Sequence, residues 1–161
     1  MNKGLKERGK NLYLTAEREE DLVVLATLSQ DALITISNMT WARRKRRFAF
    51  LMTRFCWELS DFYTERNGKL KRINSIMSFD TVLSVKSKGI DQAKAGTILS
   101  LLTIKHCCSK SEERKIELIF SGGGKITLAV ECIEVLLKDV SSPFNSTASN
   151  IPQHLDEGVG D

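Results

Sequence analysis

The strongest constraint on the fold is a pair of alternating apolar segments around a glycine run. Apolar residues occupy every second position over residues 116–120 and 126–130, and Ser-Gly-Gly-Gly fills positions 121–124. A period of two places alternate side chains on one face of a strand, and glycine adopts the positive φ that a tight turn requires. This pattern predicts a β-hairpin. It excludes a phosphate-binding P-loop, because that loop leads into a helix and only a strand follows Lys125.

Other segments are also rich in β-forming residues. We expect strands over residues 33–36, 48–57 and 98–107, and either two strands over 73–79 and 82–88 or one strand bent at Asp80. Asn67-Gly68 marks a turn in the loop that follows Leu59. Both faces of residues 48–57 are apolar, which is typical of a strand covered on both sides.

Two segments show helical spacing instead. Residues 16–31 carry a one-sided apolar stripe behind an acidic first turn, with Thr15 as the candidate N-cap. Residues 130–140 place apolar side chains three and four apart, and the Ser-Ser-Pro at 141–143 ends the pattern. The sequence therefore predicts an N-terminal and a C-terminal helix.

The fold class that follows is α+β: one helix, about seven mostly antiparallel strands, and a final helix. The strands form a twisted sheet or a split barrel, since this element order is also that of pleckstrin-homology-like barrels. We expect one domain over residues 12–141 and disordered tails over 1–11 and 142–161, which are polar.

Positive charge is concentrated in one part of the chain. Residues 43–72 hold ten Lys and Arg against three acids, although the net charge is only +4. We interpret the turn at 43–47 as a solvated hairpin tip in preference to a nucleic-acid site or a site for an acidic partner, because adjacent strand residues such as Arg46 and Arg47 face opposite ways. The candidate partner surface is Arg43, Arg44, Lys45, Arg46, Arg66, Lys69 and Lys71.

Arg54 is a cation in the middle of an otherwise apolar strand. A buried charge requires a partner, and Glu58 on the same strand face or Asp80 from elsewhere could supply it. A paired structural arginine is the favoured interpretation, and an arginine that anchors a ligand is the alternative.

The cysteines and histidines give no metal or catalytic signature. In His106-Cys107-Cys108 neighbouring side chains point to opposite faces of a strand, and zinc sites require paired ligands at wider spacing. We therefore interpret the two thiols as incidental, and we expect no metal, no cofactor and no catalytic residue.

The N-terminal residues lack the apolar core of a signal peptide, and no run of 18 apolar residues occurs. We expect a cytoplasmic protein with free thiols and no membrane span.

Four stretches together resemble a known family: LTAEREEDLVVLATLSQDALI, RRFAFLMTRFCWE, SFDTVLSVKSKGID and IELIFSGGGKITLAVECIEVLLKDV. They are similar to a domain-of-unknown-function family of small proteins found chiefly in alphaproteobacteria, and the resemblance covers residues 12–140. It implies a single-domain bacterial cytoplasmic protein and no particular activity.

The functional hypothesis is a non-enzymatic binding or adaptor domain for a macromolecule, with a protein partner favoured over nucleic acid. The alternative is a nucleic-acid-associated protein that uses the basic region 43–72. A third, weaker hypothesis is an enzyme with Arg54 in an apolar pocket.

Overall fold

The computed structural model describes residues 11–59, 70–108 and 110–145. Within these ranges the chain forms ten strands and one α-helix, joined by turns of which four are short 3-10 helices. In chain order the elements are β1 (Tyr13–Ala16), α2 (Glu19–Leu28), β2 (Leu33–Thr35), η1 (Ile36–Asn38), β3 (Met39–Ala42), η2 (Arg43–Lys45), β4 (Arg47–Phe55), η3 (Trp57–Leu59), β5 (Arg72–Phe79), β6 (Val82–Lys88), β7 (Ile98–Cys108), β8 (Arg114–Phe120), η4 (Ser121–Gly123), β9 (Lys125–Val130) and β10 (Val135–Asp139).

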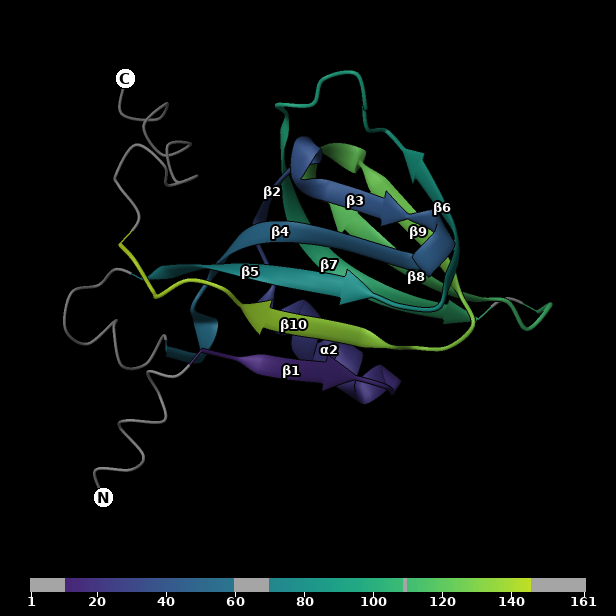
Figure 1. The fold of residues 1–161 in the computed structure, drawn as a ribbon, viewed down its shortest axis with the longest axis horizontal. Helices are drawn as coiled ribbons and strands as arrows, with labels where there is room; N and C mark the ends of the chain where they lie inside the picture. Colours follow the sequence, from purple (N-terminus) through teal and green to yellow (C-terminus); the bar gives the residue numbers. More distant parts are fainter. Residues whose placement is uncertain (1–10, 60–69, 109, 146–161) are drawn as a thin grey trace.

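The strands form one antiparallel sheet that folds over on itself. Its order is β1-β10-β5-β4-β2-β7-β8-β9-β6, and β3 pairs with β4 beside β2. Figure 1 shows β4, β5, β10 and β1 side by side in one layer, with β7, β8 and β9 behind them. Helix α2 packs against β1 and β7, so it lies at the side of the molecule where these two layers are not joined by strand pairing.

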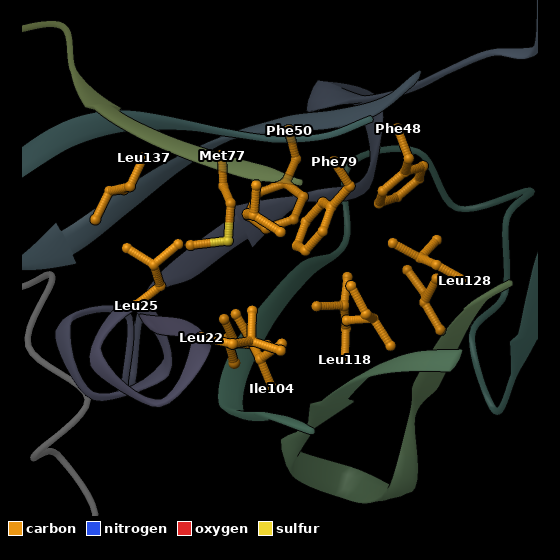
Figure 2. Close-up of a cluster of buried hydrophobic side chains, with 14 of the residues drawn as sticks. Leu22, Leu25, Phe48, Phe50, Met77, Phe79, Ile104, Leu118, Leu128 and Leu137 are labelled. Carbon is orange, nitrogen blue, oxygen red and sulfur yellow. The ribbon is translucent and has the colours of Figure 1, made fainter. Parts of the chain in front are cut away.

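The core lies between the two layers. Figure 2 shows aromatic and aliphatic side chains of β4, β5 and β10 directed toward side chains of β7, β8 and β9, with α2 contributing from one side. The rings of Phe50 and Phe79 lie 6.1 Å apart, in contact across the β4–β5 pair. The largest buried apolar side chains are Phe50, Phe79, Phe120, Leu22, Leu25, Ile34, Met52, Met77, Leu101, Ile116 and Leu118.

The predicted α+β fold with a C-terminal helix is wrong. Residues 135–139 form strand β10, which inserts between β1 and β5, and the described residues are mostly antiparallel strand with a single α-helix. The helical spacing was misleading because Asp139 is buried and interrupts the apolar alternation of Val135 and Leu137. A pleckstrin-homology-like barrel ends in a helix, so that prediction fails with it.

The N-terminal helix exists but is shorter than predicted. Helix α2 spans Glu19–Leu28, because residues 13–16 pair with β10 as an additional strand. Thr15 is therefore not the cap. Instead, the carboxylate of Asp21 accepts hydrogen bonds from the backbone N–H groups of Glu17 (3.1 Å) and Arg18 (3.2 Å) at the start of the helix.

The strand predictions hold better. The glycine run joins β8 to β9, and residues 73–79 and 82–88 belong to two separate strands, β5 and β6, rather than to one bent strand. However, β4 is covered on one face only: its outward-facing Leu51, opposite Ile76 on β5, is 38% exposed. The predicted Asn67-Gly68 turn lies outside the described residues.

Candidate functional site: an apolar groove between two strand edges

A groove of about 440 Å³ opens between β3 and β6. This volume lies within the range of about 300–1,000 Å³ that is usual for ligand pockets. Its wall carries three polar side chains, Ser37, Ser87 and Gln92. The larger apolar side chains that line it are Ile36, Met39, Trp41, Phe48, Val85, Ile90 and Ile126. An apolar floor with a few polar groups is the usual composition of a binding site.

Backbone hydrogen bonds close both ends of the groove. At one end the N–H of Val82, the first residue of β6, donates to the carbonyl of Arg46 at 2.9 Å. At the other end the N–H of Ser37 donates to the carbonyl of Ala95 at 3.0 Å, and the N–H of Ile36 donates to that of Thr97. The groove is therefore an opening in the folded sheet that backbone hydrogen bonds bound at both ends.

Strand geometry explains why these residues face the groove. Trp41 on β3 and Phe48 on β4 are cross-strand partners, so their side chains share one face. On β6, Val85 and Ser87 line the groove, while Lys86 and Lys88 alternate with them on the other face of the strand. Each wall thus presents apolar groups to the groove and polar groups to solvent.

The glycine run has a second role beside the hairpin turn. A Cβ on Gly124 would lie 3.1 Å from Cγ1 of Ile90, and a Cβ on Gly89 would lie 3.0 Å from the carbonyl oxygen of Gly123. Gly89 also has a φ of +72°, which side-chain-bearing residues rarely adopt. The absence of side chains at these positions lets the chain after β6 approach the β8–β9 turn, and this places Ile90 in the groove wall.

The two strands that flank the groove have free edges. Within residues 11–59, 70–108 and 110–145, strand β6 pairs only with β9 and ends the sheet order, and β3 pairs only with β4. Among the residues that the structure describes, the bond from Val82 to Arg46 is the one backbone hydrogen bond that joins β6 to the segment containing β3 and β4. A row of unpaired N–H and C=O groups on a strand is a template for another strand.

Arg54 lies outside the groove in a closed network of polar groups. Its side chain is fully buried and donates to both oxygens of Asp139 at 3.0–3.1 Å and to both oxygens of Glu58 at 2.9 Å. It also donates to Oγ of Ser75 at 3.2 Å and to the carbonyl of Phe55 at 2.9 Å. The guanidinium therefore joins β4, β5, β10 and η3.

The electrostatics of this network favour a permanently charged arginine. Burial by itself would lower the pKa of Arg54, but the hydrogen bonds and negative charges of Glu58 and Asp139 outweigh it, and the pKa is raised. Asp139 also accepts the backbone N–H of Leu12 at 2.7 Å. With its donors occupied by protein groups, Arg54 has a structural environment, and Asp80, the other suggested partner, pairs instead with Arg47 at 2.7 Å.

The basic residues that the structure describes do not form one surface. Arg43, Arg44 and Lys45 are exposed in η2, and Arg46 follows in a left-handed conformation and pairs with Glu131 at 2.7 Å. Lys71 lies beyond the opposite end of the β4–β5 pair, about 27 Å away for eight strand residues. Arg66 and Lys69 lie outside the described residues. The structure thus separates the turn from Lys71.

Sequence reasoning missed the groove. It had no means to place β3 opposite β6, because these strands are forty or more positions apart in the chain. Local patterns carry no signal for such an arrangement. Within the described ranges, no three His, Cys, Asp or Glu side chains are arranged to hold a metal ion, and no helix has the length and apolarity to cross a membrane.

Comparison with known proteins adds one result. Residues 12–154 match a family described as a protein of unknown function, DUF2948. The chain belongs to the DUF2948 family. This confirms the family resemblance seen in the sequence, and the match covers all the strands of the structure as well as α2. No curated protein and no solved structure matches this DUF2948 chain.

Proposed function

We propose that this DUF2948 protein is a non-enzymatic binding domain that holds an extended segment of a partner protein in the groove between β3 and β6. The observation that carries the proposal is the coincidence of an apolar groove with the free edge of β6. Addition of a strand to a free sheet edge is a common mode of peptide recognition, in which backbone hydrogen bonds supply affinity and side-chain pockets supply specificity.

We derive the expected partner segment from the chemistry of β6. A peptide paired with residues 84–88 would be about five residues long, or about 16 Å. Its inward side chains would meet Trp41, Phe48 and Ile126, so they should be apolar. Its outward side chains would lie beside the exposed Lys86 and Lys88, where opposite charges across a strand pair contribute about 0.2–1 kcal/mol each. The expected segment alternates apolar and acidic residues.

Trp41 provides a direct assay. A synthetic peptide that alternates leucine and glutamate is titrated into the Trp57→Phe variant, and the fluorescence of Trp41, which lines the groove, is followed. We expect saturable binding in the micromolar range, about −7 to −8 kcal/mol. A peptide of the same composition with its leucines and glutamates in two blocks should bind at least about tenfold more weakly, a difference of about 1.4 kcal/mol.

Matched variants test the location. Ser87→Phe fills the groove from β6 and should abolish binding, whereas Thr40→Phe adds the same ring to the exposed face of β3 and should not. Equal affinity for the two peptides, or equal binding by the two variants, would refute the proposal.

The same titration with a duplex oligonucleotide tests the alternative. Arg43, Arg44 and Lys45 are the exposed basic groups of η2, and three phosphate contacts would give a log–log salt slope of roughly −2 to −3. Salt-dependent binding that disappears in the Arg43→Ala, Arg44→Ala, Lys45→Ala triple variant would favour the nucleic-acid function over the peptide-binding one.

A further inference from the structure

Three side chains with complementary chemistry meet at the end of β7, outside the groove. Nδ1 of His106 lies 2.5 Å from Oε1 of Glu19 in the first turn of α2, and Nε2 of the same ring lies 3.9 Å from Sγ of Cys108. The carboxylate and the thiol thus contact opposite nitrogens of one imidazole. His106 and Glu19 are 87 positions apart in the sequence, so the fold itself brings them together.

The pairing with Glu19 determines what the ring can do. An ionised carboxylate only accepts hydrogen bonds, so Nδ1 carries the hydrogen and the neutral ring presents a lone pair on Nε2. That lone pair faces the sulfur of Cys108. The arrangement of thiol, imidazole and orienting carboxylate is the one that activates a nucleophile by removing its proton.

The sulfur is accessible and has a basic residue opposite it on the neighbouring strand. Cys108 is exposed, and its cross-strand partner on β8 is Arg114, which is also exposed. A neighbouring positive charge and partial exposure characterise reactive cysteines. The side chain of His106 is only 9% exposed, so the base is held in the structure while the sulfur is open to solvent.

We propose that Cys108 is a reactive thiol, activated by His106 and positioned through Glu19, which exchanges with low-molecular-weight disulfides. The thiol proton moves to Nε2 of His106 while the sulfur attacks one sulfur of the disulfide. A bond forms between Cys108 and that sulfur, the original S–S bond breaks, and the departing thiolate takes the proton from the imidazolium. The protein then carries a mixed disulfide, and one small thiol is released.

The sequence interpretation of incidental thiols considered His106 with Cys107 and overlooked its pairing with Cys108. Cys107 alternates to the other strand face, but Cys108, two positions from His106, shares its face. The adjacent cysteine is therefore a natural control: it has the same sequence environment, and among the described residues it is Cys108, not Cys107, that contacts the imidazole.

The experiment uses the full chain and 2-hydroxyethyl disulfide, an uncharged probe, with mixed-disulfide formation followed by mass spectrometry and peptide mapping. In the Cys107→Ser background, which keeps Cys108, the rate should be at least about tenfold above that in the Cys108→Ser background, which keeps Cys107. Adding His106→Ala to the first background should slow it by about tenfold, and free imidazole should restore much of the loss.

Two further variants separate positioning from folding. Glu19→Gln should slow Cys108, and Glu19→Asp should recover part of the rate, because a carboxylate again orients the ring. His106→Gln serves as a second base-free variant, and circular dichroism checks the fold of each protein. The proposal fails if His106→Ala and His106→Gln leave the rate of Cys108 within about twofold, or if imidazole does not restore it.

Discussion

Replacement of Arg54 by methionine should lower the free energy of unfolding substantially. Arg54→Met keeps a long unbranched side chain and removes every guanidinium donor, so that of the described partners Asp139 keeps Ser75 and the N–H of Leu12. The side chain of Asp139 is 1% exposed, and water cannot replace the lost cation. Removal of one partner from a buried ion pair costs about 3–5 kcal/mol, which is a large share of the 5–15 kcal/mol typical of a domain.

Urea unfolding followed by circular dichroism measures this cost. At a slope of about 2 kcal/mol per molar, the midpoint of Arg54→Met should fall by about 2 M. Adding Asp139→Asn removes the unpaired charge and keeps an oxygen that can accept the N–H of Leu12, so the double variant should recover about 1–2 kcal/mol over Arg54→Met.

Glu58→Gln serves as a control that should destabilise the protein less than Arg54→Met does. The side chain of Glu58 is 25% exposed, and its pairing with Arg54 is partly replaced by solvent, so the loss should be about 1 kcal/mol. Two results would refute the reasoning: a loss below about 1 kcal/mol in Arg54→Met, or no recovery in the double variant. Either would mean that the buried carboxylate does not depend on the arginine.

Two other perturbations test the structure away from this network. Gly89→Ala should lower the free energy of unfolding by about 1–2 kcal/mol, because a φ of +72° and the carbonyl of Gly123 oppose a Cβ. Gly96→Ala is the control and should change this free energy little, because no atom lies within 4 Å of the added Cβ. Equal urea midpoints for the two variants would contradict this. Burial raises the pKa of the Cys56 thiol to about 11, so at pH 8 only about one molecule in a thousand carries the thiolate. Iodoacetamide should therefore leave Cys56 unmodified in the folded protein and label it in urea. Rapid labelling of the native protein would contradict this and show that Cys56 is accessible.

Local patterns predicted local structure well and long-range arrangement poorly. The hairpin of β8 and β9, the strands β5 and β6, and the existence of α2 follow from periodicity and turn residues that act over a few positions. The groove and the Glu19–His106–Cys108 cluster depend on contacts between segments far apart in the chain, for which one sequence holds no local signal.

Strand β1 shows how tertiary pairing overrides local preference. Residues 13–16 precede an acidic helical segment and could continue it, yet they pair with β10 over four positions from Tyr13 to Ala16. This pairing satisfies the outer edge of β10, which would otherwise remain open. The gain exists only once β10 is a strand, and the incorrect helix prediction for residues 130–140 therefore concealed β1 as well.

The sequence did contain one clue to this arrangement. Arg54 was recognised as a charge that does not fit an apolar strand, and a buried charge requires an opposite one. Asp139 is the corresponding misfit in residues 135–139, where it occupies the inward position after Val135 and Leu137. Two oppositely charged residues in apolar segments, such as Arg54 and Asp139, predict that these segments lie close together in space. Here that reasoning would have replaced the C-terminal helix with a strand near β4, since the strand conformation turns Val135, Leu137 and Asp139 to the same face as Arg54.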